Sequence, residues 1–122
     1  MATVMVVEDD RNQRILYEQE LGEEGHEVIL AEGGRQALEK LNEVTPDIVV
    51  LDISMPGMDG IETLGKILGR ERDIPVILNT AYSSYKDNFM TWSADAYVVK
   101  SSDLTELKDK ITEILEGKKP AE

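Results

Sequence analysis

The sequence has 122 residues, of which 41% are hydrophobic and 31% charged, a composition typical of one globular domain with a single core. The formal net charge of −12 argues against nucleic-acid binding by this chain, because affinity for phosphate backbones comes from Lys and Arg, and it favours a cation or a basic partner surface. There is no cysteine, no stretch of roughly 20 apolar residues and no signal-peptide pattern, so we expect a cytoplasmic protein without disulfides, thiol chemistry or a membrane partner.

Short apolar runs that are rich in β-branched residues predict buried strands at residues 3–7, 28–30, 48–51, 76–78 and 97–99. The segments that follow the first, second, third and fifth runs carry apolar residues at helical spacing, and we predict a helix in each. After the fourth run, Tyr85, Phe89 and Trp92 also have helical spacing, but the segment is short. We therefore predict a weaker helix at residues 81–92.

Three pairs of residues have the spacing of a capping box, in which the N-cap side chain and the side chain three positions later each accept a backbone N–H. They predict where three of the helices begin. The pairs are Asp10 with Gln13, Asp59 with Glu62, and Asp103 with Glu106.

The alternation of apolar strands with helices predicts an α/β fold, a doubly wound five-stranded parallel sheet that helices cover on both faces. We expect one domain over residues 1–117, followed by a tail or linker stub at residues 118–122. In such a sheet, ligands bind beyond the carboxyl ends of the strands. The residues that follow the strands are therefore the candidates for a functional site.

Charged and polar residues follow four of the predicted strands and fall on this same edge of the sheet. Carboxylates gathered in one cleft repel one another unless a cation offsets their charge, and oxygen ligands of this kind suit Mg²⁺. A carboxylate beside a bound cation, with a lysine and a hydroxyl nearby, can accept a phosphoryl group as an acyl phosphate. The residues are Glu8, Asp9 and Asp10 after the first strand, Asp52 after the third, Asn79 and Thr80 at the end of the fourth, and Lys100 after the fifth.

Each of these residues also has a simple structural interpretation. Asp10 fits a helix cap, which leaves Glu8 and Asp9 for the metal. Asp52 taken alone could end a strand before a Pro-Gly turn, the threonine could be an ordinary strand residue, and the lysine a surface charge. Their convergence on one edge favours the functional interpretation over four separate structural ones.

Four segments give the sequence a resemblance to a known family over nearly its whole length. They are VMVVEDD at 4–10, PDIVVLDISMPGMDGIE at 46–62, PVILNTAY at 75–82 and AYVVKSSDLTEL at 96–107. Together they resemble the receiver domains of two-component response regulators, which include the chemotaxis-type (CheY-like) single-domain proteins. The resemblance implies a flavodoxin-like sheet with strand order 2-1-3-4-5. It also implies that the domain is not an enzyme that acts on an external substrate. The domain would catalyse only its own phosphorylation and dephosphorylation.

Carried over by position, the resemblance makes Asp52 the phosphoacceptor. Glu8 and Asp9 would join it as side-chain ligands of Mg²⁺, together with the backbone carbonyl of Ser54. The phosphoryl donor would be a histidine kinase or a phosphotransfer protein, and a downstream protein would read the result. We expect a monomer or a weak dimer.

The resemblance also assigns a switch. Thr80 matches the hydroxyl that turns toward the phosphoryl oxygens, and Lys100 matches the ammonium that pairs with them. Tyr97 matches the aromatic residue that moves inward with the threonine. The change would then reach the surface formed by the helix at 81–92, the fifth strand and the last helix.

The sequence departs from the family pattern in the last third of the chain. Ser101 stands where the family usually has proline, often with a cis bond, which would cost ~3 kcal/mol before serine. We therefore expect a different loop after Lys100. The interval between Thr80 and Lys100 is also shorter than usual and lacks the common glycine before the fifth strand, which bears on the helix predicted at 81–92.

Two alternatives remain. A phosphohydrolase of the haloacid dehalogenase type also uses an aspartyl nucleophile and Mg²⁺, but its chemistry needs a second acid two residues later, where this chain has Ser54. A degenerate receiver would serve only as an interaction module. The complete set of acids, hydroxyl and lysine argues against it.

Overall fold

The protein is described by a computed structural model that covers residues 2–52, 60–70, 73–81, 94–101 and 103–117. Its strands form one parallel sheet in the order β2-β1-β3-β4-β5. This confirms the predicted α/β fold and its strand order, and each apolar run coincides with a strand. The strands are β1 (Thr3–Val7), β2 (Glu27–Ala31), β3 (Ile48–Leu51), β4 (Val76–Thr80) and β5 (Ala96–Val99).

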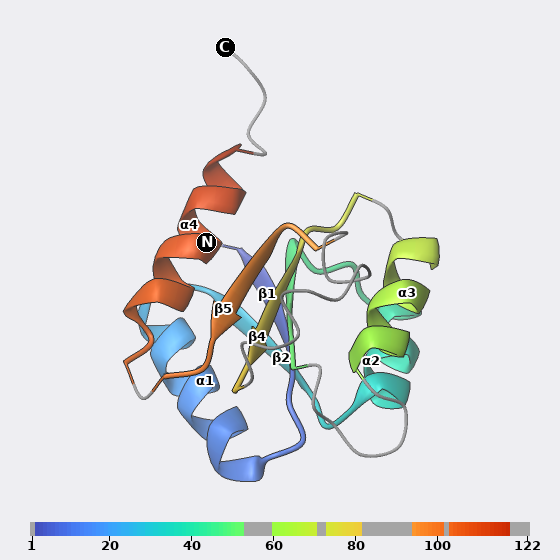
Figure 1. The fold of residues 1–122 in the computed structure, drawn as a ribbon, viewed down its shortest axis with the longest axis horizontal. Coiled ribbons are helices and arrows are strands. Elements are labelled where there is room, and N and C mark those ends of the chain that lie inside the picture. The colour runs from blue at the N-terminus through green and yellow to red at the C-terminus, as the bar shows by residue number, and fades with distance from the viewer. Residues whose placement is uncertain (1, 53–59, 71–72, 82–93, 102, 118–122) are drawn as a thin grey trace.

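Among the described residues, helices cover both faces of the sheet, two on each (Figure 1). The helix predicted at 81–92 falls outside the described residues except for Ala81, and so does the tail at 118–122. None of the described helices is long and apolar enough to cross a membrane. One face carries α1 (Arg11–Glu23) and α4 (Thr105–Gly117), and the other carries α2 (Gly34–Leu41) and α3 (Gly60–Arg70).

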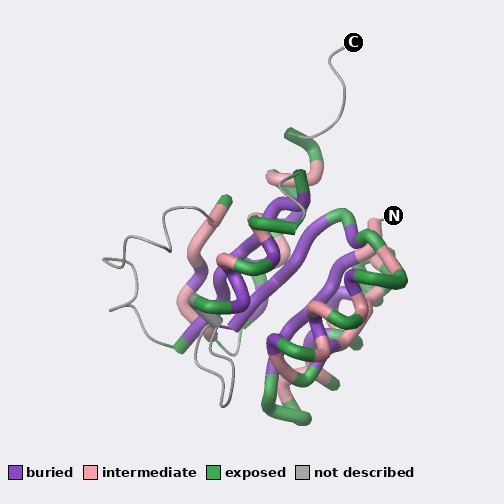
Figure 2. The backbone as a smooth tube through the Cα atoms, turned by 90° about the vertical axis from the view of Figure 1, so that its right-hand side faces the viewer, coloured by how far each residue is buried: buried purple, intermediate pink, exposed green. Residues whose placement is uncertain are grey.

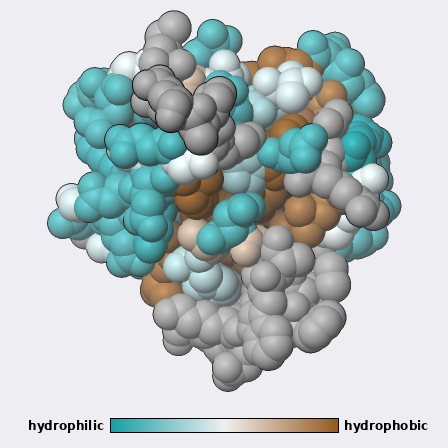
Figure 3. Space-filling model, turned by 90° about the horizontal axis from the view of Figure 1, so that it is seen from above, coloured by the Kyte–Doolittle hydropathy of each residue, from teal (hydrophilic) through white to brown (hydrophobic). Residues whose placement is uncertain are grey.

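Two apolar layers, one on each face of the sheet, form the core. Successive side chains of a strand point to opposite faces, so Met5 of β1 packs in the layer under α2 and α3, while Val4 and Val6 pack in the layer under α1 and α4. Figure 2 shows β1, β3 and β4 buried along most of their length, whereas the helices alternate between buried and exposed positions. Figure 3 views the edge formed by the amino ends of the strands, where hydrophobic residues lie between hydrophilic ones. Burial on both faces explains why the central strands are continuous apolar runs in the sequence.

The first helix begins as predicted at Asp10, but its capping box is incomplete. The Asp10 carboxylate accepts the backbone N–H groups of Asn12 and Gln13 at 2.8 and 3.2 Å. The N–H of Asp10 donates to Glu8 Oε2 at 3.1 Å and not to the side chain of Gln13. The upstream Glu8 carboxylate takes the place expected for the Gln13 side chain, so the reciprocal half of the predicted box is wrong.

The last helix repeats this arrangement. Asp103 Oδ1 accepts the backbone N–H of Thr105 at 2.9 Å and its hydroxyl at 2.6 Å. The N–H of Asp103 donates to Ser101 Oγ at 3.1 Å, which takes the place expected for Glu106. The third predicted box includes Asp59, which lies outside the described residues.

The parallel register brings the carboxyl ends of the strands together at the lower edge of the sheet in Figure 1. Val7 of β1 pairs with the last residue of β3, so the next residues, Glu8 and Asp52, leave adjacent strands side by side. The N–H of Asp52 donates to the Val7 carbonyl at 3.1 Å, and the N–H of Lys100 donates to the Thr80 carbonyl at 2.7 Å. The predicted site residues therefore start from a rigid hydrogen-bonded edge.

Candidate functional site

Three carboxylates converge at this edge. One oxygen from each of Glu8, Asp9 and Asp52 lies within 4.8 Å of the others. Glu8 and Asp52 are 1% and 5% exposed, whereas Asp9 is exposed to solvent. The fold thus holds two acids in place and leaves the third side of the cluster open to an incoming ion.

Lys100 lies between the two buried acids. Its Nζ donates to Asp52 Oδ2 at 2.9 Å and also to Glu8 Oε1. Burial by itself would lower the pKa of Lys100, but the hydrogen bonds to Glu8 and Asp52 and the attraction of their charges outweigh it and raise the pKa above its usual value. The ammonium is therefore charged at neutral pH and offsets part of the negative charge of the cluster.

Glu8 has both carboxylate oxygens engaged. Oε1 accepts from Lys100, and Oε2 accepts from the N–H of Asp10. Burial nevertheless raises the pKa of Glu8, more than these hydrogen bonds lower it, and repulsion from Asp52 adds to the effect. Two buried carboxylates share one ammonium, so an excess of negative charge remains, which a divalent cation would relieve.

The remaining predicted residues differ from one another in where they lie relative to the acid cluster. Thr80 is fully buried at the end of β4 and bonded through its carbonyl to Lys100, so it belongs to the same edge. Tyr97 is partly buried in β5, where it pairs with Leu78 and packs against the apolar layer under α2 and α3. Ser54 lies outside the described residues.

Asn79 does not join the acids. Its Nδ2 donates to the hydroxyl of Tyr17 at 2.8 Å inside the core, on the α1 side of the sheet. Burial raises the pKa of Tyr17, so the phenol stays neutral. No local pattern in the sequence shows that the Tyr17 hydroxyl would meet an amide 62 positions away.

Arg14 is a site residue that the sequence did not reveal. Its guanidinium donates to the backbone carbonyls of Glu8 and Asp9 at 2.8 and 2.9 Å. The only signal in the sequence is its place one turn after the acids on a predicted helix. An exposed arginine in the first turn of a helix would look the same in sequence.

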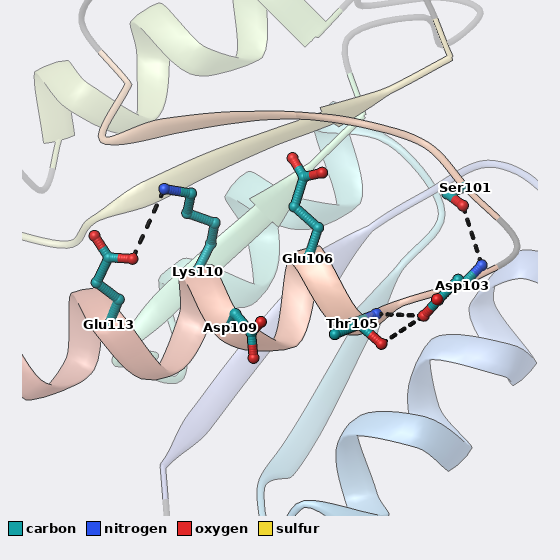
Figure 4. Close-up of a pocket in the computed structure, with 7 residues that line it drawn as sticks. All are labelled: Ser101, Asp103, Thr105, Glu106, Asp109, Lys110 and Glu113. Carbon is teal, nitrogen blue, oxygen red and sulfur yellow. Dashed lines mark hydrogen bonds and ion pairs between the residues drawn. The ribbon is translucent and has the colours of Figure 1, made fainter.

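A pocket separate from the acid cluster lies along the start of α4 (Figure 4). Four of its lining residues are acidic, and the fifth charged residue, Lys110, pairs with Glu113 at 3.7 Å. Neither Asp52 nor the other two acids of the cluster line this pocket. The acids that line it are Asp103, Glu106, Asp109 and Glu113.

The acid cluster has the donors that a hard divalent cation needs. Carboxylate oxygens are the usual ligands of Mg²⁺, which takes few protein ligands and keeps several waters. The adjacent ammonium of Lys100 can pair with an anionic group next to Asp52. This combination suits binding of a cation and transfer of a phosphoryl group to a carboxylate.

Comparison with known proteins gives a match to the family model of the response regulator receiver domain, over residues 4–112. Response regulator protein TrrA from Thermotoga maritima, in a crystal structure in complex with Mg²⁺-BeF, is 45% identical. The match covers 93% of this chain and 99% of that one with a TM-score of 0.90. A crystal structure of histidine kinase ThkA in complex with TrrA matches with 45% identity, coverages of 94% and 99%, and a TM-score of 0.88.

Two curated relatives differ in how much of their length this chain covers. It is 32% identical over 114 residues to sporulation initiation phosphotransferase F of Bacillus subtilis, covering 92% of both proteins. It is 37% identical over 106 residues to the regulatory protein AtoC of Escherichia coli, which is 85% of this chain but 23% of AtoC. The chain therefore spans nearly the whole of one relative and about a quarter of the other.

Proposed function

The chain belongs to the response regulator receiver family, a family of signalling modules, and from that premise we propose that Asp52 accepts a phosphoryl group from a histidine kinase or a phosphotransfer protein. The observation that carries this proposal is the convergence of three carboxylates with one lysine at the carboxyl edge of the sheet. Glu8 and Asp52 both follow central strands and both bond to Lys100, so the choice of Asp52 as the acceptor rests on the family resemblance. The TrrA structure with Mg²⁺-BeF, from a protein of the same family, supports a role for Mg²⁺ in this chain.

The donor set fits Mg²⁺, because it offers three hard oxygen ligands within 4.8 Å of one another and a buried excess of negative charge. We assign Glu8, Asp9 and Asp52 as side-chain ligands, and the backbone carbonyl of Ser54, by the family resemblance, as a further one. When bound, the ion would supply positive charge to the phosphoryl oxygens.

Each of the site residues would then have its own role in phosphoryl transfer and in the switch. An Asp52 oxygen forms a bond to phosphorus as the bond from phosphorus to the donor's histidine nitrogen breaks. Lys100, already within 2.9 Å of Asp52, pairs with the phosphoryl oxygens, and Thr80 offers its hydroxyl from the end of β4. Tyr97, three positions before the lysine on β5, would follow Thr80 as the switch residue.

The complex of ThkA with TrrA supports a histidine kinase as the partner of this chain. For the output, we propose the side of the molecule that carries β5 and α4, with its acidic pocket, as the surface that a downstream protein reads (Figure 4). A population shift between two conformations would link Asp52 to that surface.

Phosphorylation by a small donor tests the proposal without a cognate kinase. Incubation with acetyl phosphate and Mg²⁺ should add about 80 Da, the mass of one phosphoryl group, to the intact protein. The adduct should be absent in Asp52→Asn and when Mg²⁺ is removed with a chelator. Asp47→Asn is the matched control, because Asp47 is an exposed acid next to a strand on the opposite edge, where it accepts the N–H of Thr3. An adduct that persists in Asp52→Asn, or forms without a divalent cation, would contradict the assignment.

A further inference from the structure

Arg14 contacts the backbone of both acids in the loop between β1 and α1. Its Nη1 donates to the carbonyl oxygens of Glu8 and Asp9 at 2.8 and 2.9 Å. Its Nη2 forms an ion pair with Glu32 Oε1 at 3.3 Å. The Arg14 side chain is 12% exposed, so this guanidinium is largely withdrawn from water and fixed by three oxygen partners.

Two successive carbonyls that bond to one nitrogen fix the orientation of the peptide groups that carry them. The direction of each Cα–Cβ bond follows from the backbone. The hydrogen bonds from Arg14 therefore also set the direction in which the Glu8 and Asp9 side chains leave the backbone. On the amino side the segment is anchored to β2, since the N–H of Glu8 donates to the Ala31 carbonyl at 3.0 Å. On the other side Asp10 is held as the cap of α1. Arg14 supplies the restraint between these two anchors.

The far end of the guanidinium is held as well. Glu32 follows β2, and its N–H donates to Gln36 Oε1 at 2.7 Å, while Gln36 Nε2 donates to Glu32 Oε2 at 3.4 Å. Gln36 lies in the first turn of α2. The loop before α2 therefore orients the carboxylate that pairs with Arg14, and the arginine is restrained at both ends.

We propose that Arg14 is a positioning residue for the cation site, because its guanidinium holds the Glu8–Asp9 backbone in the geometry that turns both carboxylates toward Asp52. The inference rests on the proposed function, since it concerns binding of Mg²⁺ by these acids. A planar guanidinium reaches two carbonyls and a carboxylate together, whereas a lysine ammonium cannot reproduce this fork.

Titration calorimetry with Mg²⁺ alone, on the full chain, tests the proposal. Outer-shell substitutions commonly weaken metal binding by about 10- to 100-fold, and we expect Arg14→Ala to raise the Kd for Mg²⁺ by about tenfold. Arg14→Lys, which keeps the charge and one donor group, should recover part of the affinity. The melting temperature without Mg²⁺, measured on each variant, separates a change of affinity from a loss of fold.

Arg70→Ala is the matched control. Arg70 Nη1 also donates to a backbone carbonyl, that of Leu38, at 2.8 Å and to Asn42 Oδ1 at 3.0 Å, but these bonds link α3 to the end of α2. The Arg70→Ala substitution should lower the melting temperature. The Kd for Mg²⁺ should stay within about twofold of wild type, since Arg70 bonds to none of the proposed cation ligands.

The possible outcomes distinguish failure of the Arg14 proposal from failure of the proposed function. If wild type binds Mg²⁺ and Arg14→Ala binds it equally well, the inference is wrong and the proposed function stands. If Arg70→Ala weakens binding as much as Arg14→Ala, the effect is general destabilisation and the inference is also wrong. If Arg14→Ala does not fold, Arg14→Lys decides, because full wild-type affinity in that variant overturns the role of the fork. If wild type binds no Mg²⁺ and takes no phosphoryl group, both proposals fail together.

Discussion

Lys100 lies 92 positions from Glu8 and 48 positions from Asp52 in the sequence, yet its ammonium bonds to both carboxylates. Removal of one partner from a buried charged group costs more than the bond itself contributes, because the remaining charge is left without compensation. Here the side chain is 19% exposed and the cluster is open at Asp9, so solvent screens part of this cost.

We therefore predict that Lys100→Met lowers the free energy of unfolding by about 1–3 kcal/mol in the absence of divalent ions. Saturating Mg²⁺ should reduce this loss, because the cation takes over the compensation of the acids. Urea unfolding with and without Mg²⁺ measures both effects.

The control is Lys66→Met, which removes an exposed pair with Glu62 at 3.7 Å. Exposed pairs of this kind are worth less than about 1 kcal/mol, so this variant should stay close to wild type with or without Mg²⁺. Equal losses for the two lysine variants would show that Lys100 does not balance the acid cluster.

The sequence predicted the candidate residues but not all of their contacts. The acids and Lys100 could be predicted because parallel strands end on one edge and each residue directly follows a strand. The bond between Asn79 and Tyr17, and those of Arg14, depend on the rotation of side chains on separate elements. Strand and helix periods carry no information about such rotations.

Among the helices, α4 shows how a local motif sets the start of an element. Hydrogen bonds from the hydroxyl and the N–H of Thr105 hold the pKa of Asp103 below its usual value of 3.8. A carboxyl whose pKa is lowered by folding stabilises the fold above its unfolded pKa, and this contribution is lost as the pH falls through the lower, folded value. The stabilisation from Asp103 should thus be complete at neutral pH and disappear only in acid.

We predict that Asp103→Ala lowers the melting temperature at pH 7 and that its difference from wild type shrinks as the pH falls below 3.8. Differential scanning calorimetry from pH 7 downward measures this. Asp109→Ala, an exposed acid on the same helix and in the same pocket, serves as the control and should show a smaller difference at pH 7. A difference for Asp103→Ala that stays constant over the whole pH range would mean that the ionised carboxylate does not cap α4.

The elements themselves followed from the sequence more closely than their caps did. Residues 3–7 and 48–51 were predicted as strands with the bounds that the structure shows, because continuous apolar runs of this length fit a strand buried on both faces. The capping boxes at Asp10 and Asp103 were wrong in their second half, since the acceptors of these two N–H groups come from residues upstream, and the box at Asp59 stays a prediction. The capping-box spacing relates the cap only to a residue downstream of it, so it gives no information about an upstream acceptor.

For the molecule as a whole, the sheet links a charged edge to two layers of helices. Both core layers continue without interruption from the strands that end in the acids to the helices on either face. In the proposed switch, a change at Asp52 would reach α4 through β4 and β5, which are paired up to Thr80 and Val99. The proposed function requires that Asp52 be the residue that takes the phosphoryl group.

Chemical trapping of the acyl phosphate tests this most directly. Borohydride reduces an aspartyl phosphate to homoserine, which marks the modified residue permanently for peptide sequencing by mass spectrometry. After incubation of the wild-type chain with a phosphoryl donor and Mg²⁺, we predict homoserine at position 52, with Glu8, Asp9 and Asp10 unchanged, and none at position 52 when Mg²⁺ is withheld. Homoserine at Asp9 or Asp10 in place of Asp52, or a phosphorylated chain in which no carboxylate is reduced, would contradict the account.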